Sequence, residues 1–107
     1  MNQNDAAHGL KALGNETRLS VFRLLVRAGE NGLPIGRIAQ DMNVPLSTLA
    51  HHLDLLVRAS LIVQKREGRE VYCKANYATL NALTAFLTEK CCEGLGPAPQ
   101  EDEAMAT

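Results

Sequence analysis

Tryptophan is absent from the sequence, and aromatic residues make up only 4% of its 107 positions. The interior of the folded chain must therefore be built mainly from Leu, Ile, Val and Ala. The three cysteines are too few, and odd in number, for the disulfide framework of a small secreted domain, so we expect reduced thiols. No apolar run approaches the roughly 18 residues that a membrane-spanning helix needs, and the first residues lack the features of a secretory signal. We therefore expect a cytoplasmic protein that does not contact membranes.

The net charge of −1 conceals an uneven distribution of charge. Residues 1–90 contain all 11 basic residues and carry a formal charge of +3, whereas residues 91–107 contain four acids and no base. Glycines and prolines near the start of this acidic segment disfavour regular structure. We therefore predict one domain over residues 1–92, followed by a flexible acidic tail over residues 93–107. A single small core often gains stability from a partner subunit, which favours a homodimer.

Apolar residues recur at spacings of three and four in several segments, which is the pattern of amphipathic helices. Asn4 or Asp5 can cap the first helix, Gly14 ends it, and Asn15 is a suitable cap for the second. Pro34 suits the first position of the third helix. The predicted helices cover, approximately, residues 5–13, 17–27, 34–42, 46–59 and 77–90.

Between the fourth and fifth predicted helices the pattern changes to that of β-strands. Residues 61–66 and 69–74 are short β-prone runs, and the dipeptide Glu67-Gly68 between them is typical of a tight hairpin turn. The predicted order is three helices, a turn, a fourth helix, a hairpin and a last helix. This order predicts a mainly α fold with a small β-hairpin, the winged helix-turn-helix.

The fourth predicted helix separates a leucine-rich side from a polar side, at about 100° per residue. Short polar side chains at the start of such a helix let phosphates approach its N–H groups and let hydroxyls or an imidazole reach base edges. A solvated polar face is the alternative interpretation, but the preceding turn and the following hairpin favour DNA. The candidate base-reading residues are Ser47, Thr48 and His51. His52 lies closer to the leucine side, so we expect it to be partly buried with a hydrogen-bond partner.

Basic side chains gather around the tip of the predicted hairpin, at Lys65, Arg66 and Arg69. On a hairpin beside a recognition helix, such side chains can neutralise backbone phosphates or enter a minor groove. Glu67 and Glu70 offset part of the charge, and the alternative is a charged tip that only keeps the hairpin soluble. The proximity of the polar helix favours the phosphate role.

Three stretches carry a family resemblance: residues 14–19 (GNETRL), 47–56 (STLAHHLDLL) and 66–72 (REGREVY). They resemble the ArsR/SmtB family of bacterial winged-helix repressors, and the resemblance covers about residues 8–92. Ser60 stands where the family usually has Gly, and Ala50 replaces a common Ser, which removes one hydroxyl near DNA. Neither departure is expected to abolish the fold.

The resemblance implies a homodimer that occupies double-stranded operator DNA and releases it when an inducer binds. A twofold dimer would read two half-sites roughly one DNA turn apart. The first and last helices usually form the dimer interface in this family. Here they offer apolar faces made by Leu10, Leu13, Leu80, Leu83 and Leu87.

The sensor sites of the family vary between members, and most of them have no counterpart in this sequence. The Cys-x-Cys pair of one site type corresponds here to Pro34 and Gly36. The last helix lacks the Asp and His ligands of the zinc sites, and residues 15–28 lack the cysteine of the persulfide sensors. What remains is Cys91-Cys92, which resembles the arsenic-sensing branch whose last helix ends in a vicinal pair. The third cysteine that commonly follows the pair is absent.

Two adjacent thiolates are soft ligands and select soft centres. Trivalent arsenic takes three donors, so arsenite needs a third donor from water, a small thiol or Cys73, whereas methylarsenite already carries one carbon and needs only two sulfurs. The neighbours of Cys73, Val71 and Tyr72, favour strand packing, so we expect Cys73 to be a structural thiol. We therefore predict no required cofactor, and a trivalent arsenical (arsenite or methylarsenite) as the inducer at Cys91 and Cys92.

Three other functions share some of these features. A thiol-based regulator that responds to another soft metal or to oxidation shares all of them. An arsenical carrier that does not bind DNA would leave Ser47, Thr48 and His51 without a role. An enzyme is disfavoured, because the chain has no Gly-rich phosphate loop, and adjacent cysteines are not the Cys-x-x-Cys motif of a dithiol oxidoreductase.

Overall fold

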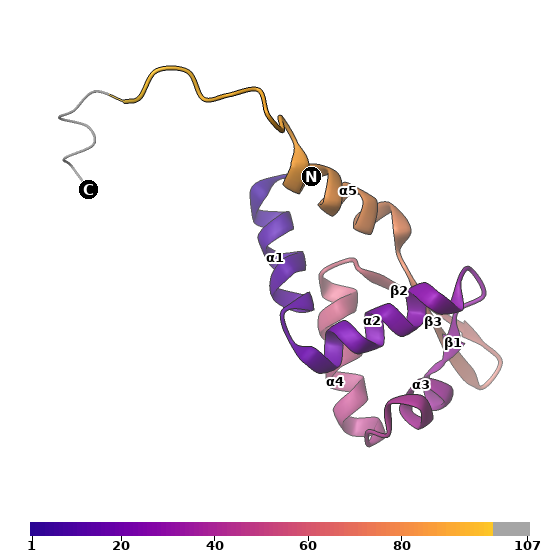
Figure 1. The fold of residues 1–107 in the computed structure, drawn as a ribbon. Coiled ribbons are helices and arrows are strands. Elements are labelled where there is room, and N and C mark those ends of the chain that lie inside the picture. Colours follow the sequence, from indigo (N-terminus) through magenta and orange to yellow (C-terminus); the bar gives the residue numbers. More distant parts are fainter. Residues whose placement is uncertain (100–107) are drawn as a thin grey trace.

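The computed structural model describes residues 1–99, which form five α-helices and three β-strands (Figure 1). The helices are α1 (Gln3–Leu13), α2 (Glu16–Ala28), α3 (Ile35–Met42), α4 (Leu46–Arg58) and α5 (Tyr77–Thr88). The strands are β1 (Leu33–Pro34), β2 (Ile62–Glu67) and β3 (Glu70–Ala75). The predicted winged helix-turn-helix order is thus confirmed, with one additional short strand. Within the described residues, no helix is long and apolar enough to cross a membrane.

Asparagine side chains begin three of the helices. Asn2 caps α1, and its Oδ1 accepts a hydrogen bond from the Asp5 N–H at 2.7 Å. The expected cap at Asn4 or Asp5 was wrong, because the earlier start places Asp5 in the first turn, where its charge favours the positive end of the helix dipole. Asn15 caps α2 as expected, and Asn76 caps α5.

Pro34 belongs to a strand and does not begin the third helix. It forms β1 with Leu33, and this strand pairs antiparallel with β3, so that the sheet order is β1-β3-β2. A proline is tolerated in β1 because this strand lies at the edge of the sheet. The α3 helix begins one residue later, at Ile35.

The turn of the hairpin lies one residue later than the sequence predicts. Glu67 pairs with Glu70, so the two turn residues are Gly68 and Arg69. Gly68 has a φ of 62°, a value that suits the first central position of the tight turns that fit twisted strands. As a result, Arg69 lies at the tip of the hairpin.

Aliphatic side chains from α1, α2, α3, α4 and the sheet form one core. The absence of tryptophan is compensated mainly by leucine and isoleucine, and Phe22 is the one aromatic side chain that is buried within residues 1–99. Helix α4 contributes three fully buried leucines to this core: Leu49, Leu53 and Leu56.

The two ends of the domain have different surfaces. Figure 1 shows α1 and α5 at the end from which the chain continues into its C-terminal segment, whereas α3 and the start of α4 lie at the opposite end. Residues 93–99 form neither helix nor strand. The part of the predicted acidic tail beyond residue 99 lies outside the described residues.

Candidate functional site

The start of α4 exposes the polar side chains that the sequence singles out. Asn43 ends α3 with a φ of 53°, a left-handed conformation that reverses the chain before α4 begins. The buried leucines of α4 then fix the rotation of the helix. In this orientation Ser47, Thr48 and His51 are all exposed on one surface.

The first turn of α4 has unused backbone donors. Pro45 precedes the helix and provides no side-chain cap. The first N–H group of α4 that donates a backbone hydrogen bond is that of Leu49, to the Pro45 carbonyl oxygen at 2.9 Å. The preceding N–H groups point out of the helix end, where the helix dipole is positive. A phosphate oxygen near Ser47 and Thr48 would meet both these donors and the two hydroxyls.

His52 is half-buried and has a partner, as the sequence predicts. Its Nδ1 lies 3.3 Å from Nη1 of Arg18, and because a guanidinium only donates, Nδ1 is the acceptor. Burial lowers the pKa of His52 below its ordinary value, and the charges of Arg18 and His51 lower it further. The imidazole is therefore neutral at neutral pH. Sequence reasoning did not find Arg18 as this partner, because 34 residues separate the two side chains.

The hairpin, or wing, presents Lys65, Arg66 and Arg69 to solvent. Lys65 lies 3.7 Å from the Glu67 carboxylate, which is a weak surface pair. The wing and α4 thus provide two groups of exposed polar and basic side chains on one domain. Lys74, further along the wing, lies 3.3 Å from Glu30 and is held toward the loop after α2.

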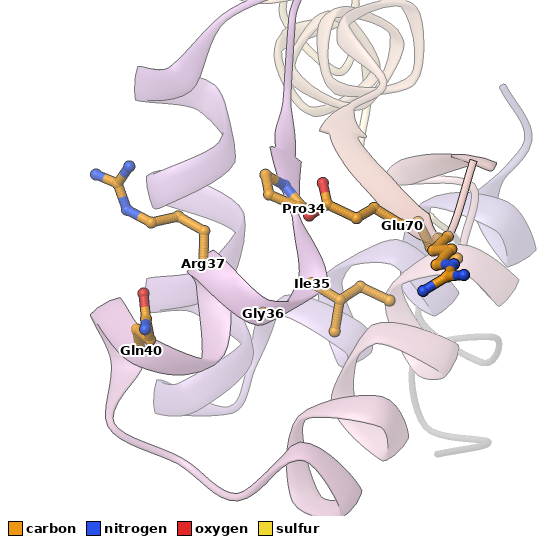
Figure 2. Close-up of a pocket in the computed structure, with 8 residues that line it drawn as sticks. Pro34, Ile35, Gly36, Arg37, Gln40 and Glu70 are labelled. Atoms are coloured by element: carbon orange, nitrogen blue, oxygen red, sulfur yellow. The ribbon is translucent and has the colours of Figure 1, made fainter. Parts of the chain in front are cut away.

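A shallow pocket of about 490 Å³ lies between the start of α3 and the wing (Figure 2). Pro34 and Gly36, which correspond to the Cys-x-Cys pair of one sensor type, both line it. Its other lining side chains include Arg37, Gln40 and Glu70, and none of its lining residues carries a sulfur. This pocket therefore offers no thiolate to a soft metal.

Cys91 and Cys92 lie just beyond α5. The sequence predicts a last helix that continues to Lys90, but α5 ends at Thr88, because Glu89 has an extended ψ of 134° and Lys90 follows with a φ of 60°, neither of which a helix contains. Both thiols are exposed and free, and their sulfurs lie 2.7 Å apart. The Cys92 thiol raises the pKa of Cys91 through their mutual hydrogen bond. The turn thus directs both sulfurs to one point, which two neighbours inside a regular helix would not do.

Cys73 is a structural thiol, as expected. It is fully buried in β3, and Nε2 of Gln64 donates a hydrogen bond to its sulfur at 3.5 Å. Burial raises the pKa of this thiol, which keeps it protonated.

The five leucines predicted for a dimer interface differ in exposure. Leu10 on α1 and Leu87 on α5 are 43% and 57% exposed. Leu13 and Leu80 are half-buried against the core of their own chain, and Leu83 is buried beside Gly9 of α1. Leu83 therefore has little surface left to contribute to a partner subunit.

Comparison with known proteins identifies the family. A family profile described as a helix-turn-helix domain matches residues 13–65. The transcriptional repressor SdpR of Bacillus subtilis is 31% identical over 70 residues, which cover 65% of this chain and 74% of SdpR. This chain belongs to the ArsR family of winged helix-turn-helix transcriptional repressors. The relatives and the fold of this ArsR-family protein are those of DNA-binding regulators and not of enzymes.

Two other relatives of this ArsR-family chain have names that refer to toxic elements. A putative arsenical resistance operon repressor of Halobacterium salinarum is 35% identical over 60 residues, which cover 56% of this chain and 46% of that protein. A homologue of the cadmium resistance regulator CadC of Staphylococcus aureus is 29% identical over 97 residues, which cover 89% and 78% of the two chains.

Solved structures share the fold over most of the chain. HlyU of Vibrio cholerae is 28% identical, with a TM-score of 0.67 over 86% of this chain and 99% of HlyU. An ArsR-like regulator of Rhodococcus sp. RHA1 is 24% identical, with a TM-score of 0.72 over 96% of this chain and 88% of that protein. The DNA-binding domain of Mb0332 from Mycobacterium bovis, described as homodimeric in solution, is 23% identical, with a TM-score of 0.66 over 89% of each chain.

Proposed function

We propose that this protein is a homodimeric repressor that holds operator DNA with α4 and the wing, and that releases it when a trivalent arsenical binds Cys91 and Cys92. The observation that carries the proposal is the pair of exposed sulfurs 2.7 Å apart at the end of α5. One soft atom can contact both sulfurs without a change in the folded domain.

The DNA-binding part of the proposal rests on the exposed surface of α4. Ser47, Thr48 and His51 offer two hydroxyls and an imidazole at the start of the helix, where recognition helices contact base edges. Lys65, Arg66 and Arg69 supply the positive charge that phosphates require. Side chains that can hydrogen-bond to base edges therefore occur on one element, and cations that can bind phosphates occur on the element that follows it.

The dimer part of the proposal rests on α1 and α5. These helices carry Leu10 and Leu87, whose exposed apolar surface would be removed from water in a dimer. The homodimeric relative from Mycobacterium bovis supports this assembly. Twofold symmetry would then present two α4 helices to two half-sites.

The arsenical part of the proposal follows from thiolate chemistry. With methylarsenite, two As–S bonds form, two As–O bonds break and two waters leave, so that the two sulfurs and the methyl carbon complete the three donors. With arsenite one position remains for water or a small thiol, because Cys73 is buried in β3. We therefore expect methylarsenite to bind more tightly than arsenite. The arsenical-resistance relative supports this choice of element.

Ligation acts on DNA through the dimer. The thiols follow α5, so a ligand there changes the geometry at the edge of the proposed interface and favours a dimer form that fits DNA less well. A hundredfold loss of operator affinity requires only about 2.7 kcal/mol of coupling.

The test is a titration of the complex between the full chain and the duplex upstream of its own gene. Arsenite, methylarsenite, zinc, cadmium and peroxide are added in turn while bound DNA is measured by fluorescence anisotropy. We expect methylarsenite to release the DNA at the lowest concentration, and Cys91→Ser/Cys92→Ser to bind DNA normally but not to respond. Cys73→Ala is the matched control, and it should respond like the unmodified chain.

Other outcomes identify other functions. Release by cadmium or peroxide at lower concentration than by either arsenical would instead indicate a sensor of another soft metal or of oxidation, and the cadmium-resistance relative gives this alternative some support. Failure to bind any duplex at low salt would favour an arsenical carrier. Release of the double-serine variant by arsenicals would show that the ligand site lies elsewhere.

A further inference from the structure

Leu46 exposes more of its side chain than any other large apolar residue in the helices and strands of residues 1–99. It is 60% exposed, whereas Leu49 and Leu53 on the same helix are buried. Leu46 therefore contributes little to the core. Its apolar side chain is therefore available for a contact outside the chain.

The position of Leu46 indicates what that contact is. It is the first residue of α4, directly before Ser47 and Thr48. Side chains on a helix lean toward its N-terminus, so that of Leu46 extends toward whatever meets the end of the helix. In helix-turn-helix proteins the N-terminal residues of the recognition helix meet the base edges of the major groove.

The chemistry of the major groove leaves one kind of partner for this side chain. Leucine has no hydrogen-bonding group, so it cannot satisfy the donors and acceptors of the base edges. The one apolar group that bases present in this groove is the C5-methyl group of thymine. We propose that Leu46 determines sequence specificity by contacting the methyl group of one thymine in each half-site, an inference that rests on the proposed DNA-binding function.

A second copy of this chain is a less suitable partner for Leu46. The start of α4 lies at the end of the domain opposite α1 and α5, whose exposed leucines Leu10 and Leu87 are the candidates for self-association. The two residues that follow Leu46, Ser47 and Thr48, carry exposed hydroxyl groups, which favour a hydrogen-bonding partner at this end of the helix.

The experiment removes the methyl group and the leucine side chain independently. Binding duplexes are first selected from a random library with the full chain, and each thymine of the best duplex is then replaced by deoxyuridine, which lacks only the methyl group. We expect one position per half-site at which this replacement weakens binding by about 4-fold, the effect of one buried methyl group. Leu46→Ala should bind more weakly and be insensitive to the replacement at that same position.

Leu19→Ala is the matched control, because Leu19 is a 42% exposed leucine on α2. It should keep the full sensitivity to methyl removal. The inference is overturned if the unmodified chain tolerates deoxyuridine at every position, or if Leu46→Ala keeps the same sensitivity, although DNA binding itself would stand. Failure of the full chain to select any duplex would overturn both the proposed DNA binding and the role of Leu46. A loss of dimer in Leu46→Ala by sedimentation, with methyl sensitivity unchanged, would assign Leu46 to self-association.

Discussion

Arg18 links two helices by donating to His52 of α4 and to the backbone of α1. Its Nη1 lies 3.3 Å from Nδ1 of His52, and its Nε donates to the carbonyl oxygen of Ala12 at 2.6 Å. One half-buried guanidinium therefore connects the last turn of α1 with the middle of α4. In the proposed repressor these are the helix at the dimer interface and the helix in the DNA groove, so their relative position depends directly on this side chain.

The neutral state of His52 predicts that the protein is less stable in acid. In the unfolded chain this histidine takes up a proton near its ordinary pKa of 6.5, whereas in the folded chain its pKa is lower. The unfolded state therefore binds more protons below about pH 7, and the free energy of unfolding falls as the pH falls through 6.5 toward the lowered pKa. Urea denaturation at pH 7.5 and pH 5.5 measures the loss.

Two substitutions assign this loss to His52. His52→Asn keeps an acceptor for Arg18 but has no proton to bind, so the difference between the two pH values should become smaller. His8→Asn, which removes an exposed histidine from α1, should leave the part due to His52 unchanged. An equal acid sensitivity of His52→Asn and the unmodified chain would contradict the prediction.

Gly32 is predicted to be intolerant of any side chain. Its φ is 65°, and a Cβ atom there would overlap the Cys73 carbonyl oxygen and lie 3.1 Å from Cβ of Lys74. Gly32→Ala should lower the free energy of unfolding by about 2–4 kcal/mol, from the combined conformational strain and overpacking. Gly36→Ala is the control, and it should raise the free energy of unfolding by about 0.5 kcal/mol. Nothing lies within 4 Å of the added Cβ atom, and alanine favours the helix more than glycine does. Equal urea midpoints for the two variants would contradict this prediction.

The proposed binding of phosphates by the wing predicts a change in salt dependence. A plot of log affinity against log salt concentration has a negative slope, and the magnitude of this slope falls by about 1 for each phosphate that the protein no longer neutralises. Arg66→Ala and Arg69→Ala should each reduce the slope by about 2 in a dimer, because each substitution removes one cation from both subunits. Lys11→Ala removes an equal charge from the last turn of α1, outside the wing, and should change the slope little. Identical slopes for all three variants would indicate that the wing does not bind DNA.

The helices of this protein are predictable because their signals are local. The leucine spacing of α4 and the asparagine cap of α2 are each contained within one or two turns, and both agree with the structure. The separation of Leu49 and Leu53 from Ser47 and His51 follows from the helical repeat alone. The exposed face of α4 is therefore correctly predicted from a short stretch of sequence.

Features that depend on distant contacts are not predictable in this way. The β1 strand has only two residues and exists because β3 pairs with it, so Pro34 resembled a helix start instead. The partner of His52 lies in another helix, and no local pattern indicates it. The predicted end of α5 was two residues late, because neither the extended ψ of Glu89 nor the left-handed conformation of Lys90 is indicated by these residue types.

The helical domain is complete before the chain reaches Cys91, since α5 ends at Thr88 and both thiols are exposed. Substitutions at the two cysteine positions therefore leave the core packing intact. If Cys91 and Cys92 hold the inducer as proposed, evolution can alter its chemical selectivity by exchanging a few residues, without changing the part that folds. The same separation lets an engineer graft metal-binding sequences after Thr88 and retain the helix-turn-helix domain.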